Sequence, residues 1–300
     1  MPSTAFEAQP QPITDYSTAV AKIAAMQEKE TATPGFDPNL RSILLTHGQK
    51  TRRAVLWFHG YTSAPPEFGA LAELCCDMGY NTFVPCVPHH GFRDRLSPEM
   101  SRVKAQELAR FADEMVDIMH GLGDEIVVGG LSMGGAMTAW VAQERPDVAV
   151  AIIVAPFLGA KIVPDALIRV VAQATQILPD IQDWWDPQKK EKMDGPHYGY
   201  FKRSYRSLGQ ILKLGFQVFD SAAKQPPSAR QVWMVTNEYD DSVSNPMADR
   251  LVASWRKSGA KNVQTFCFPD ALEIPHGCIC VDDPHANTGP VYKELMRMVG

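Results

Sequence analysis

Short apolar segments that alternate with helical segments constrain the fold of this chain more than any other feature of its sequence. Several of these segments are apolar at every position, so they have no polar face to turn toward water. Such strands are typical of parallel sheets, in which helices cover both faces. The alternation therefore predicts an α/β fold with a mostly parallel sheet flanked by helices. The predicted strands are residues 54–58, 82–87, 125–128, 148–154, 232–235 and 263–268.

Helical patterns fill the intervals between these strands. Apolar residues recur at helical spacing within residues 108–118. For that helix, Ser97 and Pro98 predict the beginning and Gly121 predicts the end. The other predicted helices are residues 16–30, residues 133–144 and a closing helix from near Thr288.

One stretch interrupts the alternation. After residue 159 the expected single crossover helix is replaced by more than sixty residues that are rich in aromatic side chains. A structureless loop of that length is improbable in a compact domain, so this stretch is predicted to be a helical lid insertion. It follows the carboxyl end of a strand, where open α/β sheets bind their ligands. The predicted organisation is an N-terminal helix and lead-in (residues 1–50), a core (residues 51–159 and 227–300) and the lid insertion (residues 160–226).

Charge and cysteine usage exclude several classes of protein. The formal net charge of -5 argues against a nucleic-acid partner, which needs a clustered basic face. The longest apolar run, residues 148–155, is too short to cross a membrane, so no stable membrane insertion is predicted. The N-terminal residues show no secretory signal. The six cysteines are spaced unlike a disulfide framework, which favours reduced thiols and a cytoplasmic location.

Residues 130–134, with the sequence GLSMG, form a G-x-S-x-G pattern between a predicted strand and a predicted helix. The chain must turn sharply there, and Gly130 and Gly134 lack the side chains that would collide across the turn. The hydroxyl of Ser132 then projects at the N-terminus of the helix. This context predicts a nucleophilic serine; the alternative is a glycine-rich turn with a capping serine.

His59 and Gly60 follow an earlier predicted strand. An oxyanion hole needs two backbone N–H groups aimed at one point, and Gly60 lets the chain approach closely enough. The candidate donors are the N–H groups of Tyr61 and Met133. His59 is predicted to orient this loop rather than to act as a catalytic base.

With these motifs the sequence resembles the α/β-hydrolase family, specifically its serine carboxylesterases and monoacylglycerol-lipase-like members. The resemblance runs from about Arg53 to the C-terminus. It implies an α/β-hydrolase fold with a lid, and oxyanion donors at the residue after the nucleophile and the residue after His-Gly. These positions are Met133 and Tyr61 here. It also implies that no metal or organic cofactor is needed.

The acid of the site is expected after the strand at residues 232–235. Members of the family often have G-x-x-D-x-x-V in this loop, which aligns Asp240 with the acid; Asp241 is the neighbouring alternative. Asn237 stands where the pattern has glycine. Because asparagine tolerates the left-handed backbone conformation, Asn237 is expected to replace that glycine.

The base is expected after the last strand. His276 precedes Gly277 in that loop, and a histidine there can reach over the sheet toward Ser132. His285 is the alternative, although it lies nearer the closing helix. In such a site the histidine removes the serine proton, and the carboxylate fixes the histidine tautomer and stabilises the imidazolium. With an ordinary histidine pKa, activity is predicted to rise through about pH 6 to 7.

The sequence thus predicts hydrolysis of small-molecule carboxylic esters, with short- to medium-chain acyl groups, through an acyl-serine intermediate. The alternatives are a thioesterase or another acyl hydrolase with the same three residues, or a non-catalytic small-molecule receptor. Trp184 and Trp185 are predicted either to contact the acyl chain or only to bury the lid insertion against the core. A zinc site is not predicted from the cluster of thiols and imidazoles near the C-terminus, because its C-x-C spacing is unusual for structural zinc. That cluster consists of Cys267, His276, Cys278, Cys280 and His285.

Overall fold

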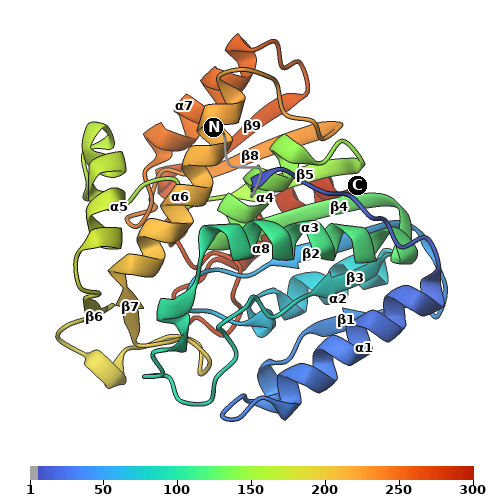
Figure 1. Ribbon diagram of the computed structural model, residues 1–300, viewed down its shortest axis with the longest axis horizontal. Helices are drawn as coiled ribbons and strands as arrows, with labels where there is room; N and C mark the ends of the chain where they lie inside the picture. The colour runs from blue at the N-terminus through green and yellow to red at the C-terminus, as the bar shows by residue number, and fades with distance from the viewer. Residues whose placement is uncertain (1–5) are drawn as a thin grey trace.

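Seven strands form one sheet in the computed structural model, which describes residues 6–300 (Figure 1). The strand order is β1-β3-β2-β4-β5-β8-β9, and every neighbouring pair is parallel except β1 and β3. The mostly parallel sheet is confirmed, and β1 is an antiparallel edge strand that the sequence pattern did not reveal. The bounds are β1 (Ile43–Leu45), β2 (Thr51–Phe58), β3 (Asn81–Val84), β4 (Gly123–Leu131), β5 (Val148–Val154), β8 (Gln231–Asn237) and β9 (Val263–Phe268).

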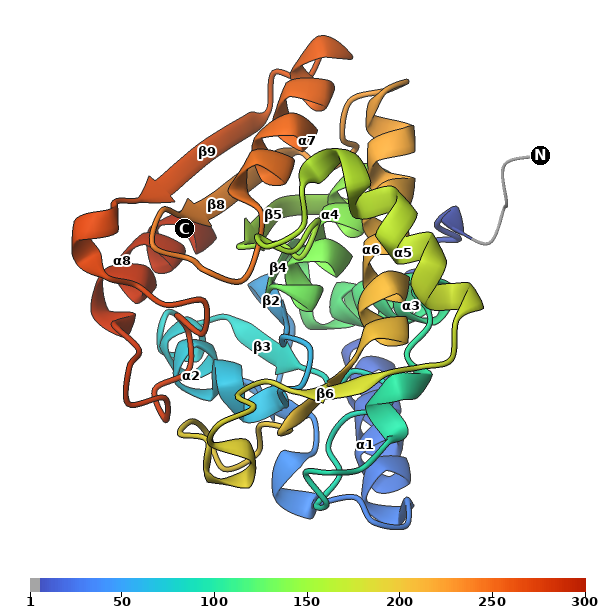
Figure 2. The ribbon, with the colours of Figure 1, turned by 90° about the vertical axis from the view of Figure 1, so that its left-hand side faces the viewer.

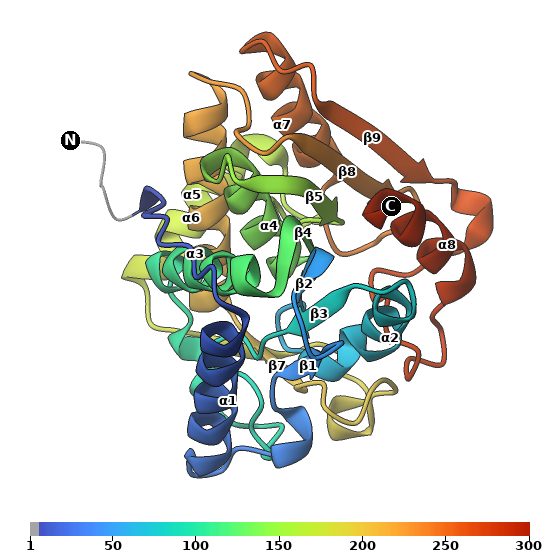
Figure 3. The same ribbon diagram turned by 90° about the vertical axis from the view of Figure 1, so that its right-hand side faces the viewer.

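Helices cover both faces of this sheet, as the apolar strands require. Figure 3 shows α2 (Gly69–Asp77) and α8 (Thr288–Val299) on one side, where they pack against each other. The other side carries α3 (Ala105–Leu122), α4 (Met133–Glu144) and α6 (Tyr205–Ala222), with α7 (Asn245–Lys257) beside α6. The N-terminal helix α1 (Tyr16–Ala32) lies outside α3. Every residue of β5 is buried between these layers.

The predicted beginning of α3 is wrong. Ser97 and Pro98 precede a single 3₁₀ turn at Glu99–Arg102, and α3 begins only at Ala105. Between the two, Val103 and Lys104 have ψ angles of 132° and 139°, which are extended rather than helical. The serine–proline signal therefore marks a short turn that leads to the helix, not the helix itself.

The insertion that the sequence predicts as a lid, residues 160–226, contains two different parts. Its last helix, α6, packs against α3 and α4 in the helical layer and forms the crossover from β5 to β8. The preceding residues form α5 (Ile168–Ile177) and a two-stranded antiparallel ribbon of β6 (Gln182–Trp184) and β7 (Lys202–Ser204). Figure 2 shows α5 and β6 in front of the sheet.

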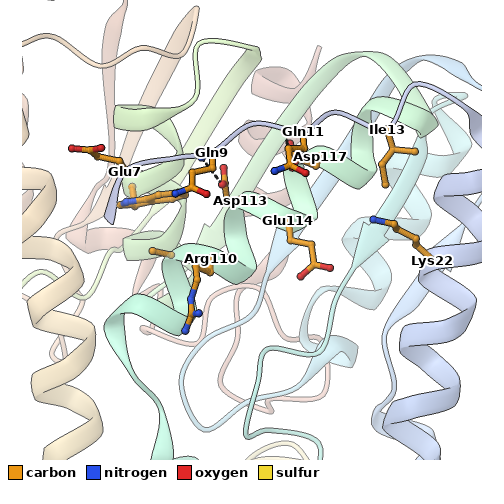
Figure 4. Close-up of a pocket in the computed structure, with 11 residues that line it drawn as sticks. Glu7, Gln9, Gln11, Ile13, Lys22, Arg110, Asp113, Glu114 and Asp117 are labelled. Atoms are coloured by element: carbon orange, nitrogen blue, oxygen red, sulfur yellow. Dashed lines mark hydrogen bonds between the residues drawn. The ribbon is translucent and has the colours of Figure 1, made fainter. Parts of the chain in front are cut away.

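The first described residues cross the outside of α3 and are held there by two of its carboxylates. Asp113 accepts a hydrogen bond from the Gln9 N–H at 2.8 Å, and Asp117 accepts one from the Gln11 N–H at 3.0 Å. Both carboxylates also bind the fully buried guanidinium of Arg145, at 2.6 and 2.7 Å. A polar cavity of about 350 Å³ lies along this crossing (Figure 4). The N-terminal segment is thereby fixed to α3 through shared acceptors.

Candidate active site

Ser132 lies in the turn between β4 and α4, in a strained backbone conformation. Its φ is 58° and its ψ is -109°, values that a residue with a side chain adopts at a cost of about 1–3 kcal/mol. Two backbone hydrogen bonds hold it there: the Ser132 N–H donates to Val154 at 3.0 Å, and the Phe157 N–H donates to the Ser132 carbonyl at 2.9 Å. This geometry is the sharp strand-to-helix turn predicted from the G-x-S-x-G pattern.

The glycines beside Ser132 are required by close backbone contacts. A Cβ atom on Gly134 would lie 2.0 Å from the Phe58 carbonyl oxygen, and one on Gly130 would lie 2.5 Å from the backbone of Gly134. Neither position can accept a side chain unless β2 or α4 moves. The two glycines therefore let α4 begin close against the end of β2, which brings the His59–Gly60 loop next to Ser132.

Asp240 and His276 come together across the ends of β8 and β9. The Nδ1 atom of His276 lies 2.7 Å from Oδ2 of Asp240, whose side chain is fully buried. The other carboxylate oxygen accepts hydrogen bonds from the N–H groups of Ser242 at 2.8 Å and Val243 at 3.1 Å. These contacts use both oxygens of Asp240 and leave Nε2 as the histidine nitrogen available to another partner.

The pKa values of this pair move apart. Burial alone would lower the pKa of His276, but the charge and hydrogen bond of Asp240 outweigh it and raise the pKa above its ordinary value. Burial alone would raise the pKa of Asp240, but His276 and the two backbone donors hold it below its ordinary value. The carboxylate thus stays ionised where the imidazole changes its charge.

Ser132 and His276 line the same cavity, which has a volume of about 610 Å³. Within the described chain, no hydrogen bond joins the Ser132 hydroxyl to the His276 ring; such contacts often tighten only when substrate is bound. Asp241, the neighbouring alternative to Asp240, is exposed and accepts a hydrogen bond from the Ser242 hydroxyl. His285 is exposed and outside the cavity lining. Neither alternative contacts the partner that its role requires.

The two candidate oxyanion donors have different surroundings. Met133 is the first residue of α4, so its N–H has no partner within the helix. The N–H of Tyr61 donates to no other residue that the structure describes. The Tyr61 side chain is anchored, because its hydroxyl accepts a hydrogen bond from the Ser204 N–H of β7 at 3.1 Å. Burial raises the pKa of Tyr61 to about 12, which keeps this hydroxyl neutral.

His59 has the structural role expected of it. The ring is fully buried, Nδ1 contacts the Gly60 carbonyl at 2.9 Å, and Nε2 accepts a hydrogen bond from the Val87 N–H at 3.0 Å. Burial, with a smaller effect of nearby His90, lowers the pKa of His59 to about 3. A neutral ring with both nitrogens in backbone contacts is suited to orienting the loop.

Glu67 is a functional candidate that sequence reasoning missed. Its carboxylate is buried, lines the cavity with Ser132, and accepts a hydrogen bond from the Gly60 N–H at 2.7 Å. Burial raises the pKa of Glu67 although the Gly60 hydrogen bond and the charge of His276 act in the opposite direction. The loop that presents the Tyr61 N–H is therefore held by a side chain from the following 3₁₀ turn, Pro65–Phe68. The Pro-Pro-Glu segment has no helical or strand periodicity, so the sequence pattern does not predict this contact.

The expected conformation of Asn237 is wrong. It is the last residue of β8 and does not have a positive φ. Its side chain instead donates to the Ile274 carbonyl in the loop before His276, while its Oδ1 atom accepts a hydrogen bond from the Tyr239 N–H at 3.1 Å. Asn237 therefore ties the loop of Asp240 to the loop of His276 through its amide group.

The two tryptophans of the lid insertion face opposite ways. Trp185 lines the cavity, whereas Trp184 is outside the lining and lies under the ammonium of Lys202, 4.6 Å from the ring centroid. Aliphatic side chains from α5 and α6 line the cavity beside Trp185, including Ile168, Val171, Ala172, Leu208 and Leu212. The cavity next to Ser132 therefore has a largely apolar wall.

All six cysteines are free thiols, and Cys280 contacts the hydroxyl of Tyr198 at 2.8 Å. Across residues 6–300, no three His, Cys, Asp or Glu side chains are grouped so that they could hold a metal ion. None of the described helices combines the length and the apolar character that a membrane span needs.

Comparisons with known proteins agree with this architecture. A thermostable monoacylglycerol lipase from Bacillus sp. (strain H-257) is 31% identical over 100 residues, which are 31% of this chain and only 36% of that lipase. One of two metagenome-derived lipolytic enzymes, LipS and LipT, superposes with a TM-score of 0.63 and 20% identity over 88% of this chain and 98% of its own. The monoacylglycerol lipase of Paleococcus ferrophilus superposes with a TM-score of 0.62 and 16% identity, over 86% of this chain and 97% of its own. Residues 43–285 match the sequence pattern of the alpha/beta hydrolase family, to which this chain therefore belongs.

Proposed function

We propose that this chain hydrolyses carboxylic esters with short- to medium-chain acyl groups through an acyl-serine intermediate. The observation that carries the proposal is the Asp240–His276 contact of 2.7 Å in a loop pair that faces the same cavity as the strained Ser132. The similarity to monoacylglycerol lipases and other lipolytic enzymes supports an ester as the substrate.

The proposed reaction begins with proton transfer from the Ser132 hydroxyl to Nε2 of His276. The serine oxygen attacks the ester carbonyl, and the N–H groups of Tyr61 and Met133 stabilise the negative charge that develops on the carbonyl oxygen. His276 then returns the proton to the departing alcohol. In the second half, His276 activates a water molecule that releases the acid from Ser132. Asp240 holds the ring tautomer and stabilises the imidazolium in both halves.

The apolar wall of the cavity supports the acyl-chain part of the proposal. Each buried CH₂ contributes about 0.8 kcal/mol, or about fourfold in affinity per carbon. We therefore expect kcat/KM to rise from acetate toward medium-chain esters and to fall once the cavity is full.

A cytoplasmic location stays a prediction from the cysteine pattern.

Two measurements test the proposal. Ser132→Ala is expected to lower kcat by several orders of magnitude with an unchanged fold, and a serine-directed phosphonate is expected to label Ser132 alone. Asp240→Asn is expected to lower kcat far more than Asp241→Asn, because only Asp240 holds the imidazole. A Ser132→Ala variant with more than about a hundredth of the wild-type activity would contradict the mechanism. Thioesters should be assayed beside the oxygen esters of the same acyl groups, because Ser132, His276 and Asp240 would act on either kind of substrate.

A further inference from the structure

The β6–β7 ribbon presents different residues on its two faces. Asp183 pairs with Arg203, and Trp184 pairs with Lys202, in antiparallel register. Because side chains alternate along a strand, the pair Trp184 and Lys202 lies on one face and the pair Asp183 and Arg203 on the other. Trp185 continues the face of Arg203. The cavity lining agrees with this alternation, since it includes Trp185 and Arg203 and excludes Trp184 and Lys202.

Arg203 is held in place mainly by aromatic rings. Its guanidinium carbon lies 4.8 Å from the ring centroid of Trp185 and 5.6 Å from that of Tyr205, and both rings also line the cavity. Asp183, whose side chain is 40% exposed, forms an ion pair with the Arg203 guanidinium at 3.7 Å, which is too long for a hydrogen bond. Stacked aromatic faces orient a guanidinium without using its N–H groups.

The hydrogen-bonding capacity of Arg203 is unused. Its guanidinium donates no hydrogen bond to any residue that the structure describes, and its Nε atom is buried without a partner. An arginine has five N–H donors in a planar fork that matches a carboxylate or phosphate group. A buried donor without a partner is costly and calls for an explanation, which a bound ligand supplies.

Charge elsewhere in the cavity restricts where an anion can bind. Glu67, Asp241 and Asp283 also line it, and each would repel an anionic group. Among the described residues that line the cavity, Arg203 is the only lysine or arginine. His276, the other group in the lining that can be positive, is already paired with Asp240. An anionic group that enters this cavity therefore has its favourable partner at Arg203.

We propose that Arg203, oriented by Trp185 and Tyr205, binds an anionic carboxylate or phosphate group of the substrate. The preferred esters of this enzyme then carry such a group at a distance from the reacting carbonyl, with the intervening carbons against the apolar wall. This inference rests on the proposed esterase function and names the substrate class for the same cavity.

The test compares charged and neutral esters in the same enzyme. In one arm, 4-nitrophenyl hemiesters of dicarboxylic acids from succinate to sebacate are compared with 4-nitrophenyl alkanoates of equal chain length. In the other arm, butyryl glycerol phosphate is compared with monobutyrin, which separates a carboxylate on the acyl side from a phosphate on the alcohol side. The wild-type enzyme is expected to prefer the charged ester in at least one arm by about tenfold in kcat/KM.

Variants identify the residue responsible for that preference. Arg203→Met is expected to reduce the charged-to-neutral ratio to one or less, and Arg203→Lys to keep part of it, because lysine is a point charge without the fork. Lys202→Met removes the same charge from the outer face of the ribbon and is expected to leave the ratio unchanged. The ratio within one enzyme cancels any general loss of activity, and the melting temperature of each variant shows whether the ribbon still packs.

Calorimetry separates this inference from the proposed function. Binding of suberate to Ser132→Ala, with and without Arg203→Met, measures the anion site without turnover. If no ester is hydrolysed but suberate binds, and Arg203→Met abolishes that binding, then the proposed esterase function fails and the anion site stands. A ratio of one or less in both arms for the wild-type enzyme, or a preference that survives Arg203→Met, overturns the inference.

Discussion

Glu67 is expected to position the loop that carries the Tyr61 N–H. Its carboxylate accepts the Gly60 N–H at 2.7 Å, and Gly60 directly precedes Tyr61. The loop is also joined to β7 through the Tyr61 hydroxyl, so Glu67 fixes its backbone while β7 fixes its ring. Replacing Glu67 with alanine removes the acceptor for Gly60 and lets the Tyr61 N–H move away from the oxygen of the reacting carbonyl.

The expected loss follows from the strength of that one contact. A hydrogen bond to a buried carboxylate is worth about 1.5–3 kcal/mol, which corresponds to a factor of about 10 to 150. Complete loss of one oxyanion donor lowers kcat by about 10² to 10³, which sets the upper limit. Glu67→Ala is therefore expected to lower kcat by about tenfold to a hundredfold. Glu67→Gln keeps an oxygen acceptor and is expected to lose about threefold or less.

The assay is kcat and KM on 4-nitrophenyl acetate, together with the rate of labelling by a phosphonate. Because oxyanion donors act on the transition state, the loss is expected in kcat and in labelling, with KM nearly unchanged. Glu73→Ala removes an exposed carboxylate from α2 and serves as the matched control. A Glu67→Ala variant with a lower melting temperature but wild-type kcat would show that Glu67 only stabilises the fold. A glutamine variant as slow as the alanine variant would refute the acceptor role.

Three further predictions concern other parts of the molecule. The rise of kcat/KM with pH is expected to have its midpoint above pH 6.5, because Asp240 raises the pKa of His276 and only the neutral ring accepts the serine proton. A midpoint at or below the ordinary histidine pKa of about 6.5 would contradict this. Trp185→Ala is expected to weaken the rise of kcat/KM with acyl length, whereas Trp184→Ala leaves it intact, as measured on the alkanoate series. Arg145→Met leaves three aspartates without their shared cation and is expected to lower the free energy of unfolding by about 3–5 kcal/mol in urea titrations, while kcat per folded molecule is unchanged.

The sequence could place Ser132, Asp240 and His276 near one another because each lies in a loop after the carboxyl end of a parallel strand. Ser132 directly follows β4, whereas Asp240 lies in the loop after β8 and His276 in the longer loop after β9. The carboxyl ends of parallel strands meet at one edge of the sheet, so strand order alone brings the loops together. The glycine spacing around Ser132 added a second, independent constraint, since only a sharp turn requires glycine on both sides. The direction of the pKa shift of His276 could be given only from the structure. Burial lowers this pKa and Asp240 raises it, and which effect is larger depends on the burial of the ring and on its distance from the carboxylate.

Glu67 and Arg203 could not be predicted, because their roles come from contacts between segments without a pattern of their own. Glu67 lies in a single 3₁₀ turn, and it contacts Gly60 only because the loop between them folds back on itself. The β6–β7 ribbon is only three residues long on each side, too short for alternation to stand out in the sequence. Trp184 and Trp185 consequently looked like one aromatic pair, although their rings face opposite sides of the ribbon.

Asn237 shows how an alignment to a family pattern can predict the wrong physical role for a residue. The pattern has glycine at this position, so the expectation concerned the backbone, and asparagine was expected to imitate glycine. In the structure the backbone of Asn237 continues β8, and its amide reaches the Ile274 carbonyl two residues before His276. A glycine could not make this contact. The acid loop and the base loop are therefore joined by one side chain, and the distance between Asp240 and His276 depends on a residue that touches neither ring nor carboxylate.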